Sequence, residues 1–245
     1  MRRIETRARS IPKQTSPPSD SARSERARMQ PRDTRGRFAR YGTVMVLDEF
    51  GNVGLLPSRS EKYFGYGVSV TKNPEAFAAV TADNRFHHEG EWKARDDTVE
   101  KRARISRCIA STETDTYGYF IDKRNPPEEW YADDRAELMT RIMEYSVRST
   151  LPETKGDVLV VVDGHKAYGD RAKQVIERTD SPWKRVTGDQ FSSADGEYSD
   201  LLQTQDYVAN AVRSHLEVGD PTRTTILKTR MHQIENGEIH DRNRD

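Results

Sequence analysis

Short apolar runs alternate along the chain with segments in which apolar residues recur at helical spacing. Two runs, 42–48 and 157–163, are nearly continuous and rich in β-branched residues. Such runs are typical of strands that are buried on both faces of a sheet. Further strands are predicted at 63–70 and 117–121, with a weaker one at 183–188.

The segments between these strands predict helices. Their expected ranges are 74–83, 98–111, 128–149, 167–178 and 199–216. Proline suits the first helical turn, and Pro74 opens the first of these helices. Strands that alternate with helices after an opening strand pair predict an α/β fold, with a mixed sheet of about five strands flanked by helices.

Composition divides the chain into three parts. Residues 1–40 contain 12 Lys and Arg against 4 Asp and Glu and almost no large apolar residue, which predicts a disordered basic tail. Residues 41–218 fit one folded domain, and 219–245 form a polar C-terminal extension. The whole chain is balanced at 40 basic and 40 acidic residues, so the body is acidic. A basic tail on an acidic body suits a polyanionic partner such as nucleic acid, although a tail that only aids solubility is an equal alternative.

Several classes of protein are excluded by the composition. The single cysteine, Cys108, cannot form an internal disulfide framework or a multi-thiolate zinc site. No apolar run approaches the length of a membrane span. Arg2 and Arg3 are not followed by an apolar segment, so we expect a cytoplasmic protein that does not bind membranes.

Three aspartates are candidates for one site. Both strongly apolar runs end in aspartate, at Asp48 and Asp163. If these strands are parallel neighbours, their ends lie about 4.8 Å apart, at the edge of the sheet where α/β proteins bind ligands. Asp206 lies at the edge of the apolar stripe of the last helix, which runs from Leu201 to Leu216, and its carboxylate can lean toward the two strand ends.

Three convergent carboxylates repel one another unless a cation neutralises them. Ligands that are all oxygen suit Mg²⁺ or Mn²⁺. In two-metal nucleases a pair of such ions, about 3.5–4 Å apart, activates water and stabilises the leaving oxygen. Each aspartate taken alone could instead cap a turn, so the joint pattern carries the prediction of a metal site.

Three segments resemble the hallmarks of the family called domain of unknown function 3800. They are Val46–Gly51, Val160–Asp163 and Leu202–Ala209. The family is regarded as ribonuclease-H-like and as a family of nucleases. The resemblance therefore implies a ribonuclease-H-like fold and metal-dependent hydrolysis of RNA or DNA, with Asp48, Asp163 and Asp206 as catalytic metal ligands.

The chain departs from the family pattern at two positions. The first motif is typically Asp-Glu-Ser-Gly, and Phe50 replaces the serine. The last motif resembles Leu-Gln-x-Ala-Asp-Leu, and Gln205 replaces its alanine. We expect Gln205 to hold the last helix further from the sheet, which would displace Asp206. Both departures bear on activity more than on the fold.

A second acidic segment also resembles the family. Glu91-Trp92-Lys93 is similar to a Glu-x-Lys element, and Asp122-Lys123 fits the pattern after the third strand. The resemblance implies that Glu91 is a fourth catalytic carboxylate, although a solvated loop glutamate is equally consistent. Lys93 and Arg95 begin a basic cluster that could hold phosphates, with an ordinary charged helix face as the alternative.

Other candidates have weaker support. Strand alternation points Glu49 away from Asp48, so Glu49 serves the site only if the strand has already turned. His165 could handle a proton, whereas His87 and His88 are adjacent and fit a surface position better.

The prediction is thus a metal-dependent nuclease. Two alternatives stay open, a non-catalytic module of the same fold that binds nucleic acid or protein, and metal-dependent chemistry on a small phosphorylated substrate. The chain lacks the glycine-rich phosphate loop of nucleoside-triphosphate enzymes.

Overall fold

The computed structural model describes eight segments of the chain and the single residue Phe38. The segments are 41–52, 61–82, 93–125, 135–151, 158–162, 185–187, 199–235 and 238–242, the first being preceded by Phe38 alone. All of them belong to one compact unit, Arg35–Asp245. Of the predicted tail, residues 1–40, the structure describes Phe38 alone, which is buried; the rest of the tail and the predicted helix at 167–178 lie outside the described residues.

Seven strands form one mixed sheet. In chain order they are β1 (Thr43–Phe50), β2 (Tyr63–Thr71), β3 (Thr114–Asp122), β4 (Val158–Val162), β5 (Arg185–Thr187), β6 (Arg230–Glu235) and β7 (Glu238–Asp241). Their order across the sheet is β5-β4-β1-β2-β3-β6-β7. The first three form an antiparallel meander, β4 runs parallel to β1, and β5 runs parallel to β4. The predicted strands are confirmed, and the sheet exceeds the expected five strands by β6 and β7.

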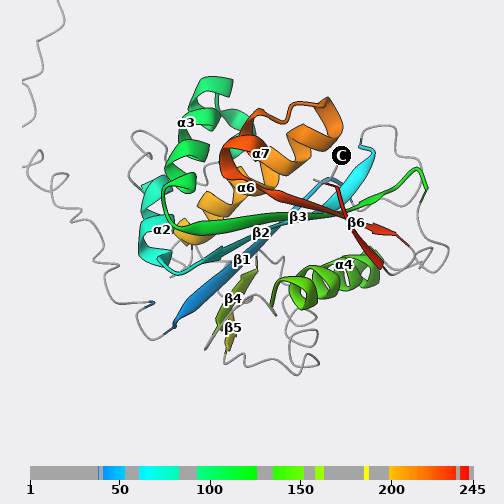
Figure 1. The fold of residues 1–245 in the computed structure, drawn as a ribbon, viewed down its shortest axis with the longest axis horizontal. Coiled ribbons are helices and arrows are strands. Elements are labelled where there is room, and N and C mark those ends of the chain that lie inside the picture. Colours follow the sequence, from blue (N-terminus) through cyan, green and yellow to red (C-terminus); the bar gives the residue numbers. More distant parts are fainter. Residues whose placement is uncertain are drawn as a thin grey trace, which may run out of the picture. The chain divides into compact units, whose positions relative to one another are not determined.

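Helices cover both faces of the sheet (Figure 1). They are α2 (Pro74–Ala82), α3 (Val99–Ala110), α4 (Arg135–Thr150), α6 (Ser199–Val218) and α7 (Thr222–Leu227), with a 3₁₀ turn, η2 (Ala94–Asp96), before α3. Helices α2, α3, α6 and α7 lie on one face and α4 lies on the other. Thr98 caps α3 by accepting a hydrogen bond from the backbone N–H of Lys101, as expected of an N-cap threonine.

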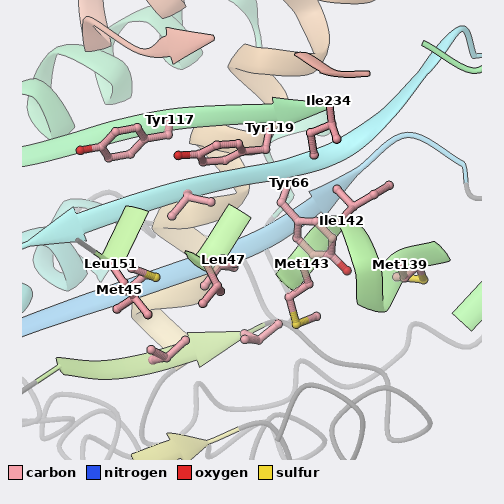
Figure 2. Packing of buried hydrophobic residues seen from close by; sticks show 14 of the residues in the cluster. Met45, Leu47, Tyr66, Tyr117, Tyr119, Met139, Ile142, Met143, Leu151 and Ile234 are labelled. Atoms are coloured by element: carbon pink, nitrogen blue, oxygen red, sulfur yellow. The ribbon is translucent and has the colours of Figure 1, made fainter. Parts of the chain in front are cut away.

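Strand alternation divides the apolar residues of β1 between two cores. Met45 and Leu47 pack with Tyr66 and the α4 residues Ile142 and Met143 (Figure 2). The alternate residues of β1, Val44 and Val46, pack in a second cluster that includes residues of α2, α3 and α6. Both faces of the central strand are buried, which explains why its sequence reads as a continuous apolar run.

The C-terminal residues extend the sheet beyond β3. Strand β6 pairs in parallel with β3, and β7 returns antiparallel to β6. Met231 and Ile234 are the buried apolar residues of β6. Ile234 belongs to the core with Met45 and Leu47, and Met231 belongs to a smaller cluster with Ala209 and Val212 of α6. Because its other residues are partly exposed, β6 lacks the apolar pattern by which the inner strands were predicted.

Candidate active site

Asp48 lies on the central strand, beside the strand that leads to Asp163. Strands β1 and β4 are parallel neighbours, and Val46 and Leu47 lie opposite Val161 and Val162. This confirms the arrangement on which the prediction of a shared site depends. Asp163 follows Val162 directly in the sequence but lies outside the described residues.

The side of the sheet on which Asp48 lies follows from alternation. Val44 and Val46 belong to the cluster with α6, so Asp48 points to the same face. Asp48 is 6% exposed and lies opposite Gly67 of β2. Gly67 has no side chain, so nothing on β2 separates Asp48 from the helix above.

Helix α6 lies directly on the row of residues that contains Asp48. The row runs across the sheet from Asp48 to Gly67 and on to Gly118 of β3. A Cβ built on Gly67 would be 2.8 Å from the Cα of Ala209, and one on Gly118 would be 2.8 Å from a methyl group of Val212. The helix therefore crosses one strand for every three residues, since three residues advance it by about 4.5 Å and strands are spaced about 4.8 Å apart.

The same step taken backward from Ala209 leads to Asp206. It brings the turn of α6 that contains Gln205 and Asp206 over β1, the strand that carries Asp48. Two of the four predicted carboxylates thus come to the same region of the sheet. The expectation that Gln205 would hold α6 away from the sheet is wrong, because α6 touches the sheet within one turn of it.

A backbone amide orients the carboxylate of Asp206. Oδ2 of Asp206 accepts a hydrogen bond from the backbone N–H of Ala94, the buried first residue of η2. Lys93, half-buried, immediately precedes Ala94. Glu91 lies outside the described residues, but its segment of the chain leads into the turn that contacts Asp206.

Arg95 is a solvated side chain. Its side chain is 72% exposed, and its Nε lies 3.7 Å from a carboxylate oxygen of the neighbouring Asp96. An ion pair this exposed contributes little to stability. The guanidinium of Arg95 can therefore reach a ligand only from the surface beside the site.

A buried network that the sequence did not reveal holds η2 and α3 against α6. The hydroxyl of Tyr207 donates a hydrogen bond to Oδ2 of Asp97, and Nζ of Lys101 lies 2.8 Å from the other oxygen of Asp97. Burial, followed by the bond to Asp97, raises the pKa of Tyr207 well above its usual range. Asp97 is separated from Tyr207 by more than a hundred residues, so no local sequence signal could pair them.

Glu49 and Phe50, which follow Asp48 in the first motif, lie on opposite faces of the sheet. Glu49 lies within β1, because the strand continues to Phe50, and it shares the α4 face with its partner Tyr66. The ring of Phe50 covers Gly65 and packs with Ala209 under α6. His87, His88 and His165 lie outside the described residues.

Gln205 is fully buried in the sheet-facing side of α6. Neither its side-chain nitrogen nor its side-chain oxygen has a hydrogen-bond partner among the described residues. A buried amide without partners is unfavourable, and native structures contain few of them. The family pattern has an alanine at this position. This chain instead buries an amide there, which is unfavourable unless it is hydrogen-bonded.

Asp122 and Lys123 bond to residues at the end of β3 and just after β1, and not to Asp48. Arg124 binds the carboxylate of Asp122, which lowers the pKa of that carboxyl. Nζ of Lys123 donates to the carbonyl oxygen of Asn52, 2.9 Å away, just after β1. Burial lowers the pKa of Lys123, opposed by the charges of nearby glutamates.

Neither a family model nor a curated protein matches the sequence. Among solved structures, the chain is similar to a chain of the PCNA–RNase HII complex from Archaeoglobus fulgidus, with 12% identity and a TM-score of 0.45. The match covers 76% of this chain and 87% of that chain. A similarity at this level says nothing about activity.

The fold is ribonuclease-H-like. Its topology carries this conclusion, with an antiparallel β1–β2–β3 meander and parallel β4 and β5 added on the far side of β1. In this fold the carboxyl ends of β1 and β4 lie side by side, which is where the acidic residues were predicted.

Metal ligands and membrane segments were sought within the described residues. There, no three His, Cys, Asp or Glu side chains are grouped to hold a metal ion. Of the four predicted carboxylates, Asp48 and Asp206 are described and Glu91 and Asp163 are not. No described helix is both long and apolar enough to span a membrane.

Proposed function

We propose that the chain is a metal-dependent nuclease that hydrolyses phosphodiester bonds of RNA or DNA. Asp48, Asp163 and Asp206 would hold Mg²⁺ or Mn²⁺, with Glu91 as a fourth carboxylate. One observation carries the proposal. Helix α6 crosses the row at Gly67 and Gly118 in steps of three residues, and the next step brings the turn of Asp206 over the strand of Asp48.

The chemistry of the described residues fits such a metal. Asp48 and Asp206 offer only oxygen ligands, as Mg²⁺ and Mn²⁺ prefer. Asp48 is a buried carboxylate, and carboxylates crowded in a buried site favour a bound cation. A bound ion of this kind would lower the pKa of a water molecule and stabilise the leaving oxygen.

The protein itself positions the carboxylates. The N–H of Ala94 holds one oxygen of Asp206, which restricts the rotation of that carboxylate. The start of α6 is fixed to α2, because the hydroxyls of Thr81 and Thr204 lie 2.9 Å apart and that of Thr204 donates to the carbonyl oxygen of Phe77. These bonds keep the helix from sliding across the strands, and catalytic sites tolerate little displacement.

Membership of the family called domain of unknown function 3800 is part of this proposal. It is supported by the positions of Asp48 and Asp206 and by the contact of the segment after Glu91 with Asp206. The alternative, a non-catalytic module that binds nucleic acid or protein, is favoured by the buried Gln205 one residue before Asp206, whose side-chain amide has no partner among the described residues.

Cleavage assays test the proposal. Purified full-length chain is incubated with single- and double-stranded RNA and DNA in Mn²⁺, beside Asp48→Asn, Asp206→Asn and the control Asp115→Asn. Asp115 is exposed near the start of β3, toward the end of the strands away from Asp48. Removal of a residue that only supports a metal ligand lowers activity roughly 10–100-fold. We expect the cleavage rate of both site variants to fall by more than this, and the control to cleave normally. Equal cleavage by all four proteins would refute the mechanism.

A further inference from the structure

Among the described residues, the buried cation Arg223 is bonded only to neutral groups. It is 4% exposed, on α7. Its Nη1 donates to Oδ1 of Asn210 at 2.8 Å, and its Nη2 donates to the carbonyl oxygen of Asn210 at 3.1 Å. Within the described part of the chain no carboxylate forms an ion pair with it. Buried charges are ordinarily paired, so this arrangement calls for an explanation.

A second arginine lies on the neighbouring helix. Arg102 is on α3, which packs against α7. The Nε of Arg102 is buried and has no hydrogen-bond partner among the described residues. Burial, followed by the charge of Arg102, lowers the pKa of Arg223 to about 10. Two like charges thus lie on packed helices and partly out of water, and one N–H donor of Arg102 is unused among the described residues.

An oxyanion would resolve both features. A guanidinium presents a rigid fork of donors that matches the oxygens of a phosphate, and a negative charge between two arginines removes their repulsion. Arg102 is only half-buried, so a ligand can approach from its exposed side. A purely structural role would leave the donor of Arg102 and the repulsion unexplained.

The two arginines lie near the candidate active site along α6. Asn210, which holds Arg223, follows Asp206 by four residues, one turn of α6. The separation along the helix axis is about 6 Å, or between one and two nucleotides at a rise of about 3.4 Å per nucleotide. Both residues therefore lie on the same side of α6, where Asp206 contacts η2 and Asn210 contacts α7.

We propose that Arg102 and Arg223 form a binding site for a phosphate group, and that this phosphate belongs to the nucleic-acid backbone next to the scissile bond. The second part rests on the proposed nuclease function, whereas phosphate binding does not. Free inorganic phosphate is the other source of the same chemistry. Asn210 acts as the positioning residue that aims the guanidinium of Arg223.

The first experiment measures inorganic phosphate. Full-length chain in EDTA is titrated calorimetrically with phosphate at constant ionic strength, beside Arg102→Gln, Arg223→Lys and the control Arg107→Gln. Arg107 is exposed on the same helix, so its loss changes the net charge equally. We expect Arg102→Gln and Arg223→Lys to weaken binding at least tenfold and Arg107→Gln to leave it unchanged. Equal binding by all variants, or no binding by the wild-type chain, would overturn the phosphate site.

The second experiment identifies the source. A fluorescent single-stranded oligonucleotide is titrated with the same proteins in EDTA, with phosphate as the competitor. Weaker oligonucleotide binding by Arg102→Gln but not by Arg107→Gln supports a backbone phosphate. Unchanged oligonucleotide binding, with phosphate binding lost, overturns the nucleic-acid part. Because both titrations exclude metal, a failure of the Asp48→Asn cleavage test leaves their result unaffected.

Discussion

Replacing Gly67 with alanine tests the close contact between α6 and the sheet. The added Cβ would lie 2.8 Å from the Cα and 2.9 Å from the N of Ala209, both backbone atoms that no side-chain rotation can move. Carbon atoms pack at about 3.5–4.0 Å, so α6 must retreat by roughly 1 Å. Overpacking of this kind costs about 1–3 kcal/mol of the free energy of unfolding.

The retreat of α6 should also be visible at the site. The N–H of Ala94 is bonded to Asp206, so moving α6 should weaken that bond and speed hydrogen exchange at Ala94. Urea unfolding followed by circular dichroism measures the stability, and nuclear magnetic resonance measures the exchange. Gly219→Ala is the control, because Gly219 ends α6 at φ +75° with no atom within 4 Å of an added Cβ.

The control should lose about 1–2 kcal/mol through backbone strain alone, without moving the helix from the sheet. We therefore expect comparable destabilisation in the two variants but faster exchange at Ala94, relative to neighbouring amides, only in Gly67→Ala. If Gly67→Ala has the stability of the wild type and the same hydrogen-exchange rate at the amide of Ala94, the close contact between α6 and the sheet is refuted.

Three further predictions concern single side chains. Phe50→Ser should lower the free energy of unfolding by about 3–5 kcal/mol in urea, because it empties the space over Gly65; a loss below 1 kcal/mol would contradict this packing. Gln205→Met should raise the melting temperature, since it removes a buried amide that has no partner within the described part of the chain, and a lower melting temperature would contradict this. Arg124 lowers the pKa of Asp122 below its ordinary 3.8, so their pair stabilises the fold above that pH and its contribution disappears as the pH falls further. The stability of Asp122→Asn should accordingly vary less with pH below about 4 than that of the wild type, and equal slopes would contradict the assignment.

Much of the fold could be predicted because each inner element has its own local pattern. The apolar runs before Asp48 and Asp163 identified β1 and β4, whereas their parallel pairing was only a condition of the predicted site, which the structure meets. The C-terminal strands escaped prediction because β6 lies toward the edge of the sheet. Only Met231 and Ile234 of β6 are buried, which is too sparse a pattern to recognise.

Only those features of the site that depend on a single helix or strand could be predicted. The helical wheel indicated the position of Asp206, but its bond to the N–H of Ala94 depends on how η2 packs on α6. The pairing of Tyr207 with Asp97 likewise arises from tertiary contact alone. Phe50 looked like a lost site residue in the motif, whereas its burial under α6 makes it a core residue.

The most direct test of the proposed metal site is a crystal structure of the full chain grown with Mn²⁺, with anomalous scattering used to locate the ion. We expect a Mn²⁺ peak bound by the carboxylates of Asp48 and Asp206 together with Asp163, and no such peak in Asp48→Asn crystals. Carboxylates of Asp48 and Asp206 that lie more than about 8 Å apart, with no Mn²⁺ between them, would contradict the shared two-metal site.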